Sequence, residues 1–408
     1  MNAITKLERN ALQQRPPSLG LPRLMQMAFD GQSLTDLAQT LIARANTDPE
    51  DANALMDLAM VLQLQGQPQL GLATLDLALQ ASRCFQQPST QTGKVKLLAL
   101  MARGDLMANA PVQFLLENSD IALEMFYLLP GEPIPEVWPE HDVALVAMSE
   151  SPAARELLQQ LGRHIDSRAL KVLLHPQRIR LTCRDQAASL LAGTPGLQMP
   201  PTVEVMRLQL LQLCAGALQP QDLLGDAPMP WIIRPVDSHA GHGLEKIDSL
   251  ADLNDYLAGQ EQHAFFVSPF VDYRSRDGLY RKYRVVLVDG QPFAGHMGIS
   301  AHWMVHYLNA GMTENPAKRA EEAQFMVTFD QEFAPRHALA LRGIHQRLGL
   351  EYLVIDCAQT AQGELLVFEV DPGAVVHAMD PTDLFPYKPA AMQKVFDAFC
   401  AMVLRHAA

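Results

Sequence analysis

The feature that most constrains the fold is a pair of apolar, strand-like segments near the C-terminus that carry carboxylates in their interiors. The first segment, YLVIDCA, contains Asp356, and the second, ELLVFEV, contains Glu369 and leads directly into Asp371. A short loop built on Gly363 joins them, which favours an antiparallel hairpin. Because side chains alternate along a strand, Glu369 and Asp371 share a face, and the hairpin can bring Asp356 beside them.

The three carboxylates predict a metal site. Carboxylates inside otherwise apolar strands are costly to bury unless a cation compensates them. Ligands that are all oxygen suit Mg²⁺, which also binds nucleotide phosphates. We therefore expect Asp356, Glu369 and Asp371 to bind Mg²⁺. In the alternative interpretation, Asp371 caps the turn before Pro372-Gly373 and the other two carboxylates face solvent.

An earlier strand-like segment, WIIRPV, ends near a cation and a loop of small residues. Arg234 lies in the strand, and the sequence SHAGHG follows at 238–243. Glycine lets backbone N–H groups approach an anion closely, and the cation neutralises its charge. The segment predicts a phosphate-binding loop, and it is not a Walker loop because GxxxxGK[ST] does not occur. The alternative is a glycine-rich hairpin loop without a ligand.

A basic strand, RKYRVVLVDG, follows at 281–290. Lys282 and Arg284 share one face of it, and a fixed guanidinium there can clamp a phosphoryl group or a developing oxyanion. A solvated basic edge is the alternative. The Asp-Gly pair in VDGQPF predicts a two-residue turn into the next strand.

The segment GHMGISAHWMVHY contains three histidines, His296, His302 and His306, with the aromatic residues Trp303 and Tyr307. Their spacing matches no known zinc pattern. We expect these side chains to line a pocket for the acceptor substrate, with ordinary packing as the alternative.

The first ninety residues predict helices. In DPEDANALMDLAMVLQLQGQPQLGLATLDLALQ, apolar residues recur at helical spacing, and Gly66-Gln67-Pro68 separates two helices. Small residues, among them Ala59 and Gly71, stand where such a pair packs tightly. The segment resembles a tetratricopeptide repeat, which implies a surface for a protein or peptide partner. A plain helical hairpin is the alternative.

After a polar linker at 83–94 the pattern changes. Three apolar runs, VKLLALM, ALEMFYLLP and DVALVAM, are separated by helical stretches such as SPAARELLQQLG. Alternating strands and helices predict a small parallel α/β domain over 94–175.

The order of these segments resembles that of the ATP-grasp superfamily, which includes glutathione synthetase, D-alanine–D-alanine ligase and RimK-type glutamate ligases. The resemblance runs from about Leu97 to the C-terminus, and CRDQAASLLAGTPGLQMPPTVEV is similar to the segment that leads into the grasp. It implies an α+β fold: a helical, tetratricopeptide-like domain at 1–90, an α/β pre-ATP-grasp domain at 94–175 and an ATP-grasp domain at 176–408.

The resemblance also implies site residues. Nucleotide binding falls to Arg184, Arg234, Ser238, His239, Gly241, Gly243, Ser268, Phe270 and Val271. Lys282 and Arg284 would act on the transferred phosphoryl group, and Asp356, Glu369 and Asp371 match the magnesium ligands. The chain departs from the family pattern in having Asp371 in place of the usual Asn, Arg234 in place of Lys and Pro269 in place of Glu.

By the same resemblance the chain is a ligase that uses ATP and Mg²⁺. It would activate a carboxylate as an acyl phosphate and join it to an amine or thiol, with an amino acid, a peptide or another small molecule as substrate. Two alternatives stay open. One is an ATP-binding interaction protein with reduced catalysis, and the other is an ATP-grasp kinase.

The net charge and the cysteines indicate the class of partner and the cellular compartment. The 408 residues include 45 acidic and 32 basic ones, for a formal net charge of -13, which disfavours nucleic acid as a partner. The five cysteines are scattered without a CxxC pair, which is typical of a reducing cytoplasm. No apolar run suits a signal peptide or a membrane span, so we expect a cytoplasmic protein without a membrane partner.

Overall fold

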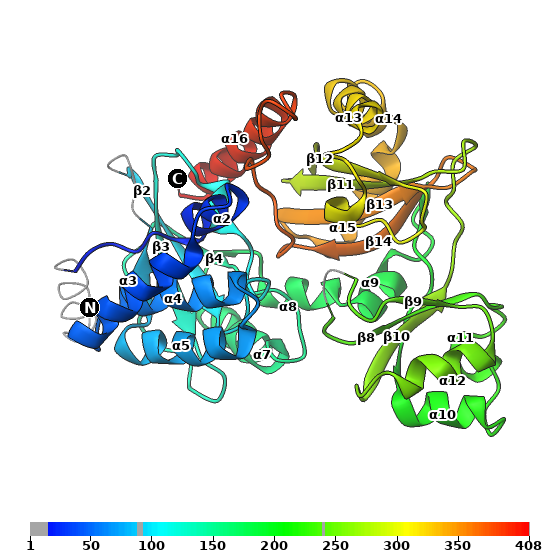
Figure 1. Cartoon of the computed structure of the whole chain (residues 1–408), viewed down its shortest axis with the longest axis horizontal. Helices are drawn as coiled ribbons and strands as arrows, with labels where there is room; N and C mark the ends of the chain where they lie inside the picture. The colour runs from blue at the N-terminus through cyan, green and yellow to red at the C-terminus, as the bar shows by residue number, and fades with distance from the viewer. Residues whose placement is uncertain (1–14, 88–92, 239–240, 408) are drawn as a thin grey trace. The chain divides into compact units, whose positions relative to one another are not determined.

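The computed structural model describes residues 15–87, 93–238 and 241–407 (Figure 1). The chain divides into two compact units. The first takes the chain up to Ile179, together with Leu350–Tyr352 and Pro372–Ala408, and the second comprises Arg180–Gly349 and Leu353–Asp371. This division differs from the three domains expected from the sequence. The helical and α/β regions belong to one unit, and residues 372–408 belong to that unit as well.

Within the described residues, the first unit begins with the helices α2 (Leu21–Phe29), α3 (Leu34–Thr47), α4 (Ala52–Leu64) and α5 (Pro68–Ala81). The side chain of Ser33 caps α3, and that of Asp51 caps α4. Helices α4 and α5 lie side by side (Figure 1). A Cβ added to Gly71 would lie 2.5 Å from the Cγ of Gln63 and 2.9 Å from the carbonyl oxygen of Ala59, so glycine is needed for this close approach. The tetratricopeptide resemblance of the pair stays a prediction.

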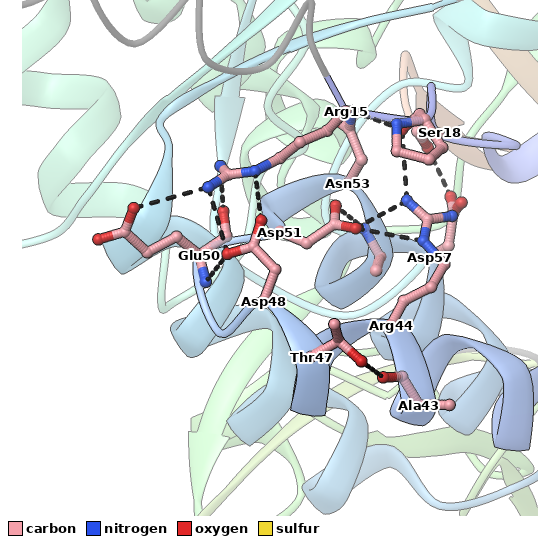
Figure 2. A network of polar contacts seen from close by, with 12 residues as sticks. Arg15, Ser18, Ala43, Arg44, Thr47, Asp48, Glu50, Asp51, Asn53 and Asp57 are labelled. Atoms are coloured by element: carbon pink, nitrogen blue, oxygen red, sulfur yellow. Dashed lines mark hydrogen bonds and ion pairs between the residues drawn. The ribbon is translucent and has the colours of Figure 1, made fainter.

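A polar network holds the segment before α2 against α3 and α4 (Figure 2). Asp57 of α4 is fully buried, and it accepts hydrogen bonds from the Ser18 hydroxyl at 2.5 Å and from the Leu19 N–H at 2.7 Å. Near it, Arg44 pairs with Asp51 at 2.9 Å. The buried carboxylate is thus satisfied by donors of the segment that it anchors.

The sheet of the first unit has the order β1-β3-β2-β4-β5. Its strands are β1 (Cys84–Gln86), β2 (Val95–Ala102), β3 (Ile121–Leu128), β4 (Val143–Val146) and β5 (Val172–Leu173). Strands β2 to β5 are parallel, as the alternation of strands and helices predicts, and β1 pairs with β3 in the antiparallel sense. The expected polar linker therefore begins with an edge strand, and its residues 88–92 lie outside the described chain.

Helices α6 (Val112–Leu115), α7 (Arg155–Arg168), α8 (Pro176–Ile179) and α16 (Lys388–Ala407) complete this unit. Helix α16 contacts α6, β2 and β4 and buries Val395, Phe399 and Val403. Across the described ranges, neither α16 nor any other helix has the length and apolar character to cross a membrane.

The second unit contains two sheets. In the first, all antiparallel, the order is β7-β10-β8-β9. The strands are β7 (Val203–Met206), β8 (Trp231–Pro235), β9 (Glu245–Ile247) and β10 (Ala264–Pro269). Helices α10 (Arg207–Cys214), α11 (Gln221–Leu224) and α12 (Leu250–Ala258) accompany it, and a core around Trp231, Leu213 and Phe265 joins strands to helices.

The second sheet has the order β12-β11-β13-β14-β6. It is formed by β6 (Leu197–Gln198), β11 (Tyr280–Val288), β12 (Gln291–Ser300), β13 (Tyr352–Gln359) and β14 (Leu365–Asp371). The expected turn between β11 and β12 has φ of 47° at Asp289 and 77° at Gly290, and Gly363 between β13 and β14 has φ of 86°. The remaining elements are η1 (Arg180–Thr182), α9 (Arg184–Leu191), η2 (Tyr307–Asn309), α13 (Pro316–Thr328), α14 (Phe333–Arg336) and α15 (Ala338–Leu348).

Candidate active site

Asp356 lies at the centre of a cluster of charged side chains on the second sheet. It is 2% exposed, and Arg284 holds both of its oxygens, with Nε at 2.8 Å and Nη2 at 3.0 Å. The Nζ of Lys282 lies 2.7 Å from Oδ2. Burial works to raise the pKa of Asp356, but the charges of Arg284 and Lys282 outweigh it and hold the pKa well below its ordinary value. The carboxylate is therefore ionised and neutralised by two cations of the neighbouring strand.

The backbone of the β11–β12 hairpin makes room for Arg284. This residue stands opposite His296, and a bulge follows at Val285. A Cβ added to Gly295 would lie 2.9 Å from both the Cγ and the carbonyl oxygen of Arg284. Burial works to lower the pKa of Arg284, but Asp356 raises it above its ordinary value. Glycine at 295 thus lets the guanidinium reach Asp356.

Glu369 stands opposite Asp356 in the β13–β14 hairpin, as the sequence predicts. It forms an ion pair with Arg184, the first residue of α9, which also donates from Nη1 to the Phe368 carbonyl at 3.3 Å. Burial works to raise the pKa of Glu369, but Arg184 in particular lowers it below its ordinary value. The charge of Asp371, two residues further along β14, also acts on Arg284.

Arg234 of β8 brings a fourth cation to the same region. Its Nε donates to the Ser238 hydroxyl at 3.2 Å, and its Nη2 donates to the Ser238 carbonyl. Burial, with the charge of Arg184 adding to it and that of Glu369 opposing it, lowers the pKa of Arg234 to about 10. Arg234 is therefore a poorly solvated cation beside a second guanidinium, a setting that favours an anionic ligand.

Two glycines of the loop after β8 have positive φ angles. Gly241 has φ of 78° and Gly243 has φ of 63°. A Cβ added to Gly243 would lie 2.8 Å from the Cδ of Pro235. The carbonyl oxygen of Gly243 accepts a hydrogen bond from the Tyr256 hydroxyl at 2.7 Å. His239, also expected in the nucleotide site, lies outside the described residues.

The segment expected to hold adenine lies at the end of β10, which contains Ser268; Phe270 and Val271 follow the strand. The N–H of Phe270 donates to the Pro230 carbonyl at 2.9 Å. Its ring meets that of Trp303 edge-on at 5.8 Å, and the Nζ of Lys246 lies 5.2 Å from its centroid. These contacts fix the Phe270 ring beside a cation and an indole.

The expected acceptor residues lie beside the charge cluster. The rings of His296 and Tyr307 are 4.7 Å apart at an angle of 38°. Burial lowers the pKa of His306, and the nearby charges of Lys282 and Arg284 add to this effect. Sequence reasoning missed Glu322 of α13, a fully buried carboxylate that accepts the Tyr307 hydroxyl at 2.9 Å. Its spacing of four from Met326, also buried, was the available signal.

The predicted magnesium ligands fit the metal by their chemistry, since all three supply carboxylate oxygens. Two of them are held by the protein's own cations, Asp356 by Lys282 and Arg284 and Glu369 by Arg184. In residues 15–87, 93–238 and 241–407, no group of three or more His, Cys, Asp or Glu side chains is arranged to hold a metal ion. The metal role of these residues stays a prediction.

Chemically, the cluster is suited to a polyanion. The four cationic side chains are Arg184, Arg234, Lys282 and Arg284, and the three anionic ones are Asp356, Glu369 and Asp371. A phosphate group can replace the carboxylate at Arg184 or at Arg284, because each anion presents two oxygen acceptors to the guanidinium fork.

Comparisons with known proteins give distant likenesses. No protein-family model and no curated protein matches the chain. Among solved structures, it is similar to the VanG D-Ala:D-Ser ligase from Enterococcus faecalis, with 13% sequence identity and a TM-score of 0.49 over 77% of this chain and 99% of that one. It is also similar to a RimK-domain ATP-grasp protein from Sphaerobacter thermophilus, with 17% identity and a TM-score of 0.42 over 76% of this chain and 99% of that one.

Proposed function

We propose that this protein is an ATP-dependent ligase that joins a carboxylate to an amine or a thiol and releases ADP and phosphate. The observation that carries the proposal is the charge cluster of the second unit, in which cations from α9, β8 and β11 meet the carboxylates of β13 and β14. Phosphoryl transfer depends on such placed charges more than on covalent chemistry by the protein.

Each part of the cluster has a role in this proposal. Arg234 and the loop that contains Gly241 and Gly243 bind the phosphates of ATP, and the backbone around Phe270 and Val271 binds its adenine. Lys282 and Arg284 stabilise the charge that develops on the transferred phosphoryl group.

Asp356, Glu369 and Asp371 would hold Mg²⁺ in the loaded enzyme. When bound, the metal would supply positive charge that offsets the charge of the phosphates. Arg184 and Arg284 would then be free to leave their carboxylates and bind phosphate.

The proposed reaction has two steps. The substrate carboxylate attacks the γ-phosphorus, the bond to the bridging oxygen breaks and ADP leaves. The amine or thiol then attacks the acyl carbon, phosphate leaves with the bonding electrons and the nucleophile loses a proton. We propose an amino acid or a peptide as the carboxylate, and the region of His296, His306 and Tyr307 as the site of the nucleophile.

Turnover with a defined pool tests the proposal. The protein is incubated with ATP, Mg²⁺ and an equimolar pool of amino acids and dipeptides, and ADP and new masses are measured. ADP release that needs two co-substrates and yields a condensed product supports a ligase. A stable phosphorylated product instead identifies a kinase.

Calorimetry tests the nucleotide site separately. We expect ATP with Mg²⁺ to bind and GTP to bind far less well, because the donor and acceptor of the 268–271 backbone suit adenine. Equal affinity for GTP, or none for ATP, contradicts the proposed site. ATP binding without turnover favours an interaction protein that uses ATP as a ligand.

A further inference from the structure

Glu322 is a buried carboxylate outside the charge cluster. It lies on α13, which contacts β12, and it is 0% exposed. A helix that covers a sheet normally buries apolar side chains, as α13 does with Met326. A carboxylate in that place costs free energy unless its oxygens are satisfied, so its contacts explain its presence.

The two oxygens of Glu322 hold two separate donors. Oε1 accepts the backbone N–H of Met297 at 3.0 Å, and Oε2 accepts the hydroxyl of Tyr307 at 2.9 Å. Met297 belongs to β12, the edge strand of its sheet, where some backbone N–H groups point away from the neighbouring strand. Glu322 therefore joins the edge strand to the η2 turn that carries Tyr307.

Tyr307 transmits this link to the charge cluster. Its ring packs on that of His296 at a tilt of 38°, and His296 stands opposite Arg284, which donates two hydrogen bonds to Asp356. Met297, whose N–H Glu322 holds, is the next residue after His296. The carboxylate thus fixes the imidazole from two sides, through the backbone that carries it and through the ring that packs on it.

We propose that Glu322 is a positioning residue, which acts through Tyr307 to hold the ring of His296 in the pocket for the amine or thiol substrate. This inference rests on the proposed ligase function for the identity of the pocket. The positional link between Glu322 and His296 stands on the contacts alone, so it is tested separately.

A carboxylate can accept both hydrogen bonds with its charge, and an amide cannot. Of the two donors, the Met297 N–H can only donate, whereas the Tyr307 hydroxyl can also accept. In Glu322→Gln the amide oxygen can keep the Met297 N–H, but the NH₂ group then faces the Tyr307 oxygen, so that hydroxyl has to turn and loses its bond to a charged acceptor. Tyr307→Phe breaks the hydroxyl contact and keeps the ring, and it therefore separates the hydrogen bond from the packing.

The experiment uses the full chain and the variants Glu322→Gln, Tyr307→Phe and the double variant. Glu314→Gln, at an exposed position before α13, is the matched control for loss of one charge. The first readout is the imidazole Cε1–H signal of His296, assigned with His296→Gln and recorded without ligands. We expect both single variants to shift this signal and the control to leave it unchanged, with all variants folded by circular dichroism.

The second readout is ADP release with the equimolar amino-acid pool as probe. In both single variants the half-saturating pool concentration should rise about tenfold, the factor expected from one hydrogen bond to a charged group, while that for ATP stays the same. If Glu322 acts through Tyr307, the double variant should be no worse than the single ones.

The possible results separate the positional link between Glu322 and His296 from the assignment of the substrate pocket. A His296 signal that neither variant shifts overturns the positional link, whatever the activity. A shifted signal with unchanged half-saturation for the pool overturns the pocket assignment. A wild-type protein that releases no ADP with any pool member overturns the ligase proposal and the pocket with it, while the His296 signal still decides the link.

Discussion

At the scale of single residues, the site consists of charged side chains that neutralise one another inside the protein. Asp356 is 2% exposed and is held by both Lys282 and Arg284. Removing one partner of a buried pair leaves an uncompensated charge, which is more costly than the pair itself. Substitutions in this cluster therefore need variants that keep shape while they change charge.

Glu369→Gln and Asp371→Asn are such variants, and we expect them to differ. Glu369 stands opposite Asp356 and pairs with Arg184, so loss of its charge should remove most activity. Asp371→Asn keeps an amide oxygen that can coordinate Mg²⁺, and it should retain measurable turnover. ADP release and the melting temperature of the ligand-free protein are measured side by side. Wild-type turnover in Glu369→Gln would end the metal-site interpretation.

His337 gives a pH dependence whose sign follows from its surroundings. Burial and, after it, the charge of Arg336 together lower the pKa of His337 to about 4. The neutral ring contacts Gln359, Nε2 to Nε2, at 2.7 Å. In the unfolded chain the imidazole binds a proton near its ordinary pKa of about 6.5. The stability contributed by the neutral ring of His337 is therefore fully present above a pH of about 6.5 and is lost as the pH falls towards 4.

Urea unfolding at pH 7.5 and pH 5 tests this expectation with His337→Gln beside the wild type. The wild type should lose more free energy of unfolding between the two pH values than the variant does. The same substitution at the exposed His263 serves as the control and should leave the wild-type pH dependence in place. Equal losses in wild type and His337→Gln would show that this imidazole is not protonated on unfolding.

At the scale of elements, two glycines in helices of the first unit make a matched pair. Gly71 of α5 has no room for a Cβ, which would lie 2.5 Å from Gln63 and 2.9 Å from a backbone oxygen of α4. Gly162 of α7 has its nearest atom at 3.4 Å, an ordinary contact. We expect Gly71→Ala to lower the free energy of unfolding by about 1–3 kcal/mol through overpacking.

Gly162→Ala should be neutral or should stabilise the protein by up to about 1 kcal/mol, because alanine is the better helix former. Both variants are measured by urea denaturation at one pH. Equal effects in the two positions would mean that α4 and α5 are not packed as closely as the contacts of Gly71 indicate.

At the scale of the whole molecule, the charge cluster lies entirely in the second unit, whereas the helices α2 to α5 lie in the first. Gly71→Ala should therefore lower stability without changing the affinity for ATP and Mg²⁺ at a temperature where the variant is folded. Calorimetry on the wild type and the variant tests this, and Arg234→Ala is the control that should weaken binding. A large loss of affinity in folded Gly71→Ala would show that the helical region contributes to the nucleotide site.

The sequence by itself determined the local elements that carry the site. Apolar runs and turn residues placed β8, β11, β13 and β14, because strand periodicity and the φ > 0 demands of Asp289-Gly290 and Gly363 are local properties. The pairing of Asp356 with Glu369 followed from that hairpin alone.

Tertiary structure decided which charges meet and which segments belong together. Arg184 reaches Glu369 across 185 positions, and Arg284 reaches Asp356 across 72, distances along the chain over which no periodicity carries information. Glu322 is buried because α13 packs on β12, and the apolar face of α16 fits any sheet until packing selects one. Such contacts depend on which apolar surfaces and opposite charges pack together in the folded chain, and this is set by the tertiary structure.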